Sequence, residues 1–287
     1  MFEVLVLATT ILLSRSAAAL AVQKPLLVQN ETTTTTTFPL FQLGPQGAYH
    51  IAYPSRSHPS LLELPLIASL VKDNDLDKIV QIITSTKSSP DTSPISESHG
   101  ETTFHTSLTP QFEDSTTWFR TPSPGTGLSI SKISLVGRLG NDRVEIYNVK
   151  LNAFTASLRL ESPYLYLPTC IYDFLIAKTM ANQAFDATND PMNDEVRDIV
   201  ACDEIGRFPE IVFEFEDEDG KEKKSVINAE DYVMKKQDGC VLMVKESEGY
   251  GGRGGSRGKR DISLGWPIAN GGGFVLDFAN GRTGMNP

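Results

Sequence analysis

Cysteine and histidine side chains are the first candidates for chemistry in this sequence, because they bind metals and react as nucleophiles. The chain has three cysteines and four histidines, at Cys170, Cys202, Cys240, His50, His58, His99 and His105. Their spacings match no zinc-ligand pattern. Gly271 to Gly273 form a glycine run, but no Lys-Ser/Thr pair and no helical pattern follow it, so the run is not a phosphate loop. We therefore expect no metal site and no cofactor.

The beginning of the chain has the pattern of a secretory signal peptide. Val4 to Leu13 is an apolar run of the length of a signal core, and Ala19-Leu20-Ala21 fits the small-x-small cleavage rule. We expect a signal peptide over residues 1–21 and a secreted, extracellular protein, although Glu3 stands where a positive charge is usual. A short buried segment and an uncleaved anchor are the alternatives. In a secreted chain three cysteines predict one disulfide and one spare thiol, and Asn30 begins a glycosylation sequon.

The charge of the chain argues against two classes of partner. The formal net charge is -10 and the isoelectric point is near 5.0. Such an acidic balance disfavours binding to nucleic acid or to an anionic membrane surface. The sequence also has no apolar run long enough to span a bilayer. We therefore expect neither a nucleic-acid partner nor a membrane anchor.

Gly249 to Arg260 is rich in glycine and arginine. Arg-Gly-Gly tracts can bind single-stranded RNA, so an RNA-binding secretory factor is one interpretation. We favour a loop between two strands, because the tract is short and belongs to an acidic chain with an export pattern. In such a loop Lys259-Arg260 is a candidate processing site for a kexin-type protease of the secretory pathway.

Residues 22–100 have little regular pattern. Thr32 to Thr37 is a run of six threonines, which is typical of a disordered or O-glycosylated stalk. Leu61 to Thr84 has helical periodicity in two pieces, and Ser85 to Ser98 has the composition of a linker. A propeptide and a weakly ordered spacer explain the region 22–100 equally well.

The second half of the chain favours strands. Val144 to Leu151 alternates as a half-buried strand does, and Glu210 to Ile227 forms two extended runs joined at Asp219-Gly220, a strong hairpin signal. Thr169 to Met180 is predicted to be a helix that begins after Pro168.

Several motifs follow one another over the last half of the chain. They are Ala156 to Pro168, Ile171 to Ala177, Phe208 to Phe215, Asp231 to Val233, Ile262 to Pro267 and Phe274 to Gly284. In order and spacing they resemble the carboxy-terminal lobe of the pepsin-like aspartic proteases. The resemblance implies an all-β, pepsin-like acid protease fold, with this lobe over residues 147–287. It also implies a disulfide between Cys202 and Cys240, with Cys170 left over at the start of a helix.

Residues 101–146 resemble a remnant of the family's amino-terminal lobe. Asp114 to Trp118 is similar to the family's Asp-Thr-Gly-Ser-Ser followed by a tryptophan, but the glycine is absent. The match implies that Asp114 stands at the first catalytic position; a polar loop with one aromatic residue is the alternative. Only about 35 residues separate Trp118 from the second-lobe strand, whereas a domain-sized lobe needs on the order of 100. The resemblance therefore implies a truncated or degenerate amino-terminal lobe.

The second catalytic position has also changed. Aspartic proteases hold two carboxylates about 3 Å apart that share one proton. In an ungapped alignment Arg159 takes the place of the second aspartate, and an arginine stays cationic at any working pH. In a gapped alignment Glu161 supplies a carboxylate on a longer arm, and a misplacement of about 1 Å can cost about 100-fold in rate. Both alignments imply weak catalysis or none.

The resemblance therefore implies a secreted aspartic peptidase homologue, a hydrolase-family member whose catalysis is impaired. Its partner would be a peptide or protein ligand held in the cleft. The alternative is an active aspartic endopeptidase that works in acid with Asp114 and Glu161, as a two-lobed dimer.

Overall fold

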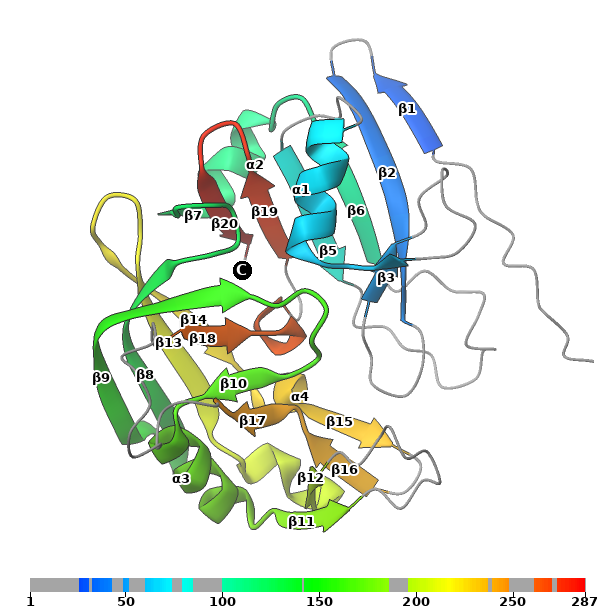
Figure 1. Cartoon of the computed structure of the whole chain (residues 1–287). Helices are drawn as coiled ribbons and strands as arrows, with labels where there is room; N and C mark the ends of the chain where they lie inside the picture. The colour runs from blue at the N-terminus through cyan, green and yellow to red at the C-terminus, as the bar shows by residue number, and fades with distance from the viewer. Residues whose placement is uncertain are drawn as a thin grey trace, which may run out of the picture.

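The computed structural model describes residues 26–30, 33–42, 49–51, 60–73, 79–84, 100–140, 142–185, 196–236, 239–247, 261–269 and 273–286. Most of these residues lie in strands, and the expected all-β class is confirmed. The strands form three sheets, of nine, seven and four strands (Figure 1). The expected signal peptide and the Lys259-Arg260 site lie outside the described residues.

The nine-stranded sheet joins the two ends of the described chain. Its order is β4-β3-β2-β6-β5-β19-β20-β7, with β1 paired to β2. The strands are β1 (Leu26–Asn30), β2 (Thr33–Gln42), β3 (Tyr49–Ile51), β4 (Ser60–Leu61), β5 (Ile79–Thr84), β6 (Gly100–His105), β7 (Thr117–Arg120), β19 (Gly273–Asp277) and β20 (Arg282–Asn286). In Figure 1 the red strands β19 and β20 lie between β5 and β7. The last strands therefore complete a sheet that the first strands begin.

The threonine run belongs to this sheet and is not an unstructured stalk. Thr33 to Thr37 form the first half of β2, and the hydroxyl of Thr37 lies 3.0 Å from that of Thr103 in β6. Phe38 and Leu40, further along β2, are buried. Threonine is β-branched and favours extended strands, which explains the difference from the expectation. The described parts of residues 22–100 thus pack into the fold.

Two helices accompany the nine-stranded sheet. The helix α1 (Leu64–Asp73) confirms the first of the two predicted helical pieces, and it buries Ile67 and Leu70. The second piece is strand β5 instead, because its apolar residues pair with β6 and β19. The short helix α2 (Pro110–Ser115) carries Asp114 and leads into β7 (Figure 1).

The seven-stranded sheet has the order β14-β13-β8-β9-β18-β10-β17. Its strands are β8 (Leu128–Leu139), β9 (Asp142–Leu158), β10 (Leu165–Leu167), β13 (Glu210–Glu216), β14 (Glu222–Ile227), β17 (Val244–Glu246) and β18 (Asp261–Leu264). Because β8 and β9 pair along almost their whole length, the expected boundary between 101–146 and 147–287 falls inside a strand. Residues 128–146 belong to the same sheet as the later motifs, not to a separate lobe.

Several local predictions in this half of the chain are confirmed. The hairpin of β13 and β14 turns at Asp219-Gly220, and α3 (Thr169–Thr179) follows Pro168. The motif Asp231 to Val233, which in the resembled family is a strand, is divided here: Asp231 and Tyr232 belong to the short helix α4 (Ala229–Tyr232), and Val233 begins a strand. A capping box between Asn228 and Asp231 starts this helix, since each side chain bonds to the other residue's backbone.

The four-stranded sheet carries the disulfide. Its order is β11-β12-β16-β15, and its strands are β11 (Asn182–Phe185), β12 (Val196–Val200), β15 (Val233–Lys236) and β16 (Gly239–Leu242). Cys202, in the 3-10 helix that follows β12, is bonded to Cys240 of β16, as expected, and Cys170 is free. One continuous core runs through the molecule, from Phe38 of β2 to Leu276 of β19.

Candidate functional site

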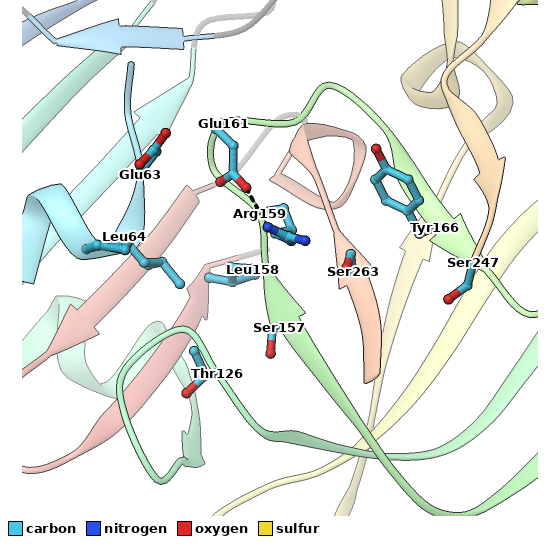
Figure 2. Close-up of a pocket in the computed structure, with 11 residues that line it drawn as sticks. Glu63, Leu64, Thr126, Ser157, Leu158, Arg159, Glu161, Tyr166, Ser247 and Ser263 are labelled. Atoms are coloured by element: carbon cyan, nitrogen blue, oxygen red, sulfur yellow. Dashed lines mark hydrogen bonds and ion pairs between the residues drawn. The ribbon is translucent and has the colours of Figure 1, made fainter. Parts of the chain in front are cut away.

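A cavity of about 880 Å³ opens between the start of α1 and the ends of β9, β10 and β18 (Figure 2). Glu63, Leu64 and Pro65 form the wall on the α1 side. Thr126 lines it from the turn before β8. The remaining lining residues come from the seven-stranded sheet and the turn that joins β9 to β10. The cavity therefore lies where the two larger sheets meet.

The turn at Gly125 connects the two sheets beside this cavity. Its backbone N–H donates to the hydroxyl of Thr283 in β20 at 2.7 Å, and its carbonyl accepts from the N–H of Leu158 in β9 at 2.7 Å. Gly125 has a φ of +80°, and an added Cβ would lie 2.8 Å from the Leu64 side chain. Glycine is required here because the conformation is left-handed and α1 approaches closely.

Hydroxyl groups from neighbouring strands form one face of the cavity. Ser157 of β9 pairs with Ser263 of the parallel strand β18. Leu165 of β10 pairs with Leu264, which places Tyr166 beside Ser263. Ser157, Ser263 and Tyr166 line the cavity, as does Ser247 after β17. Since successive side chains alternate between faces, Leu165 and Leu264 are buried on the opposite side.

The turn from Arg159 to Ser162 closes one end of the cavity and is held firmly by backbone hydrogen bonds. The N–H of Ser162 donates to the carbonyl of Arg159 at 2.9 Å, and the N–H of Arg159 donates to the carbonyl of Leu264 at 2.8 Å. The buried indole of Trp266 donates to the carbonyl of Leu160 at 2.6 Å. Leu160 is buried, so the residues on either side of it, Arg159 and Glu161, face the cavity.

Gly265 permits the close contact between this turn region and the chain after β18. A Cβ at Gly265 would lie 2.3 Å from the carbonyl oxygen of Tyr164 and 2.4 Å from that of Ser162. Both contacts are with backbone atoms, which cannot rotate away. Gly265 is thus a packing requirement of the site and not a source of flexibility.

An ion pair occupies the turn at the position of the expected second catalytic residue. Arg159 Nη1 lies 3.0 Å from Glu161 Oε1, and the Arg159 side chain is 56% exposed. In Figure 2 the guanidinium extends toward Ser263, and Glu63 and Leu64 lie on the other side of Glu161. The structure thus places both Arg159 and Glu161 at the cavity, and it joins them to each other.

Asp114 lies elsewhere. It is exposed on α2, and among the residues described here it does not line the cavity that contains Glu161. The neighbouring Glu113 instead bonds to Arg282 of β20, with Glu113 Oε1 2.8 Å from Arg282 Nη2. The two carboxylates proposed for catalysis are therefore not brought together in one cavity.

Arg282 is the centre of a buried polar cluster next to α2. Its Nε lies 2.8 Å from Oδ2 of the fully buried Asp277, and its guanidinium carbon lies 3.9 Å from the centre of the Trp118 ring. Burial by itself would raise the pKa of Asp277, but hydrogen bonds from Asn280 and Arg282 outweigh it and hold that pKa below its usual value. This cluster joins β19, β20 and β7, and we assign it a structural role.

The structure adds residues to the site that the sequence did not single out. Glu63, Ser157, Tyr166, Ser247 and Ser263 all line the cavity. Ser157 and Tyr166 flank the Arg159–Glu161 turn in the sequence, which was the available signal for them. The sequence contains no such signal for Glu63 and Ser247, because both residues are far along the chain from the Arg159–Glu161 turn and only folding brings them to the cavity.

The described residues include neither a metal-binding cluster nor a membrane-spanning helix. Within the described parts of the chain, no three His, Cys, Asp or Glu side chains are grouped so that they could hold a metal ion. None of the described helices combines the length and apolar character that crossing a membrane requires. The observed lining is of carboxylates, hydroxyls, one guanidinium and a few apolar side chains.

Comparison of the chain with models of protein families and with curated proteins found no match in either case.

Proposed function

We propose that this chain is a secreted homologue of the pepsin-like aspartic peptidases that binds a peptide or protein segment in the cavity between its two larger sheets. We further propose that it hydrolyses this ligand slowly or not at all. The observation that carries the proposal is the Arg159–Glu161 ion pair, because the sequence resemblance aligns these two residues with the family's second catalytic aspartate.

The chemistry of the pair explains why hydrolysis would be weak. An aspartic protease needs one ionised and one protonated carboxyl group that face each other across a water molecule. Glu161 is bonded to the guanidinium of Arg159 instead of facing a second carboxyl group. An arginine in that place stays cationic and cannot act as the second carboxyl group of a proton-sharing pair.

Binding is supported by the rest of the site. The cavity is lined by hydroxyls that can both donate and accept hydrogen bonds, as the main chain of a peptide requires. The turn beside them is held by the backbone bond from Arg159 to Leu264 and by the Trp266 indole, so its shape is set before a ligand arrives. A site that is already formed loses less conformational entropy when a ligand binds.

The alternative, an active acid endopeptidase that uses Asp114 and Glu161, has less support. Asp114 is exposed on α2 and is not among the described residues that line the cavity. Activity in this form would need Asp114 from a second copy of the chain to reach Glu161.

The test uses the purified full-length chain and a library of acetylated, amidated octapeptides. Binding is measured by retention on the immobilised protein, and cleavage is measured by mass spectrometry at acid and neutral pH. We expect retention without cleavage. Cleavage in acid that a statine-type inhibitor blocks, and that Asp114→Asn and Glu161→Gln each abolish, would establish the alternative. An absence of both retention and cleavage would overturn the proposal.

A further inference from the structure

The lining of the cavity has more negatively charged than positively charged side chains. Two carboxylates, Glu63 and Glu161, and one guanidinium, Arg159, line it. The net charge of the described lining is therefore one negative charge when all three groups are ionised. A negatively charged cavity with partly apolar walls attracts cations and repels anions.

The cationic side chain of this lining, Arg159, already forms an ion pair. Arg159 is bonded to Glu161 at 3.0 Å, so the charge of Glu161 is largely balanced by its neighbour in the turn. The Glu63 carboxylate has no hydrogen-bond or ion-pair partner among the residues that the structure describes. The unbalanced negative charge is thus that of Glu63, which is partly buried and lies on the opposite wall.

The two carboxylates approach the cavity from different sheets. Glu63 precedes α1, which accompanies the nine-stranded sheet, and Glu161 lies in the turn after β9 of the seven-stranded sheet. In Figure 2 Glu63 lies on the α1 side of Glu161, and Arg159 lies on the other side of it, toward Ser263. A cation placed between Glu63 and Glu161 would have a carboxylate on either side. The charges along the cavity would then alternate in the order Glu63, the added cation, Glu161 and Arg159.

We propose that the cavity selects a basic side chain of its peptide ligand, a lysine or an arginine, whose cationic group lies between Glu63 and Glu161. The inference rests on the proposed peptide-binding function and adds the class of side chain that is recognised. The flanking main chain of the ligand lies along the hydroxyl groups of Ser263 and Tyr166. Arg159 contributes by orienting Glu161 and by rejecting a second cation.

The experiment uses three octapeptide libraries that differ only at one central position. This position is lysine in the first, norleucine in the second and glutamate in the third, and all termini are acetylated and amidated. Norleucine keeps the apolar stem of lysine and removes its charge. Each library is bound to wild-type protein, to Glu63→Gln and to a control, Glu222→Gln, which removes an exposed carboxylate of β14 outside the cavity.

We expect wild-type protein to retain the lysine library about fivefold more tightly than the norleucine library, and the glutamate library least, because a charge pair that water partly screens contributes up to about 1 kcal/mol. Glu63→Gln removes this preference, Glu222→Gln keeps it, and added salt weakens it in both proteins that have it.

The outcomes separate this inference from the function on which it rests. Equal retention of the lysine and norleucine libraries, or tightest retention of the glutamate library, overturns the inference while peptide binding stands. A lysine preference that survives in Glu63→Gln also overturns it. Retention of no library removes the proposed function and the inference together. If Glu63→Gln fails to fold, the comparison of the three libraries on wild-type protein decides whether the cavity prefers a basic side chain.

Discussion

Arg159 and Glu161 form an ion pair across the turn that joins β9 to β10, with Nη1 3.0 Å from Oε1. The Arg159 side chain is 56% exposed, so water screens the attraction. The turn itself is held by other contacts, namely the backbone bond from Ser162 to Arg159 and the bond from the Trp266 indole to Leu160. The pair therefore contributes little to the stability of the fold, and its role in the proposed function is chemical.

The first prediction concerns this pair. Arg159→Gln should lower the free energy of unfolding by less than about 1 kcal/mol, because exposed ion pairs contribute little. Urea denaturation measures the change. A loss of about 3 kcal/mol or more would mean that the turn depends on the pair, and the assignment of a mainly chemical role to Arg159 would then be wrong.

The second prediction concerns Gly265. Gly265→Ala should destabilise the protein by about 1 to 3 kcal/mol, because its Cβ would overlap the backbone carbonyls of Tyr164 and Ser162. It should also weaken peptide retention, since Ser162 belongs to the turn that bounds the cavity. Thermal unfolding and the retention assay measure the two effects.

Gly206→Ala is the matched control for this change. Gly206 lies in the 3-10 helix Cys202–Arg207, and a Cβ there meets no atom within 4 Å. This control should leave both stability and retention close to those of the wild-type protein. Equal effects of the two substitutions would contradict the role given to Gly265.

The third prediction concerns pH and the buried Asp277. Its pKa in the folded protein lies below the usual value, so the unfolded chain takes up a proton first as the pH falls. The stabilisation is complete above the unfolded pKa, about 4, and is lost as the pH falls through the folded pKa. Asp277→Asn should therefore cost about 3 kcal/mol near neutral pH, and this difference should shrink below about pH 4.

Urea denaturation of wild-type protein and Asp277→Asn at a series of pH values measures this effect. Glu113→Gln is the control, because it removes the other carboxylate partner of Arg282, and the Glu113 side chain is 45% exposed. We expect that control to cost less than about 1 kcal/mol. A constant difference between wild-type protein and Asp277→Asn through the acid range would show that titration of Asp277 does not contribute.

The fourth prediction concerns the disulfide. Cys202 and Cys240 are 38 residues apart, and in the chain-entropy model such a loop stabilises the fold by roughly 4 kcal/mol. The double substitution of both cysteines by serine should lose about this amount, and chemical reduction should do the same. Cys170→Ser should lose much less, since Cys170 is free and only partly buried. A larger loss for Cys170→Ser than for the double variant would contradict the assignment.

The parts of the fold that the sequence predicted correctly are those set by neighbouring residues. The β13–β14 hairpin follows from two extended runs and Asp219-Gly220, where Gly220 has a φ of 75°. The helix α3 follows Pro168 and ends at Met180 in a left-handed conformation. Two local signals were available and missed: the β-propensity of the threonine run in β2, and the capping box that starts α4.

The sequence by itself therefore determined the all-β class, the local elements of the second half and the identity of the charged residues Arg159 and Glu161. Only the tertiary structure decided that β19 and β20 pair with β5 and β7, since those strands lie far apart in the chain and no local pattern encodes their pairing. Only the tertiary structure brought Glu63 to Glu161 and left Asp114 apart from them. Pairing between distant strands depends on burying one shared core, and that requirement acts on the whole chain at once.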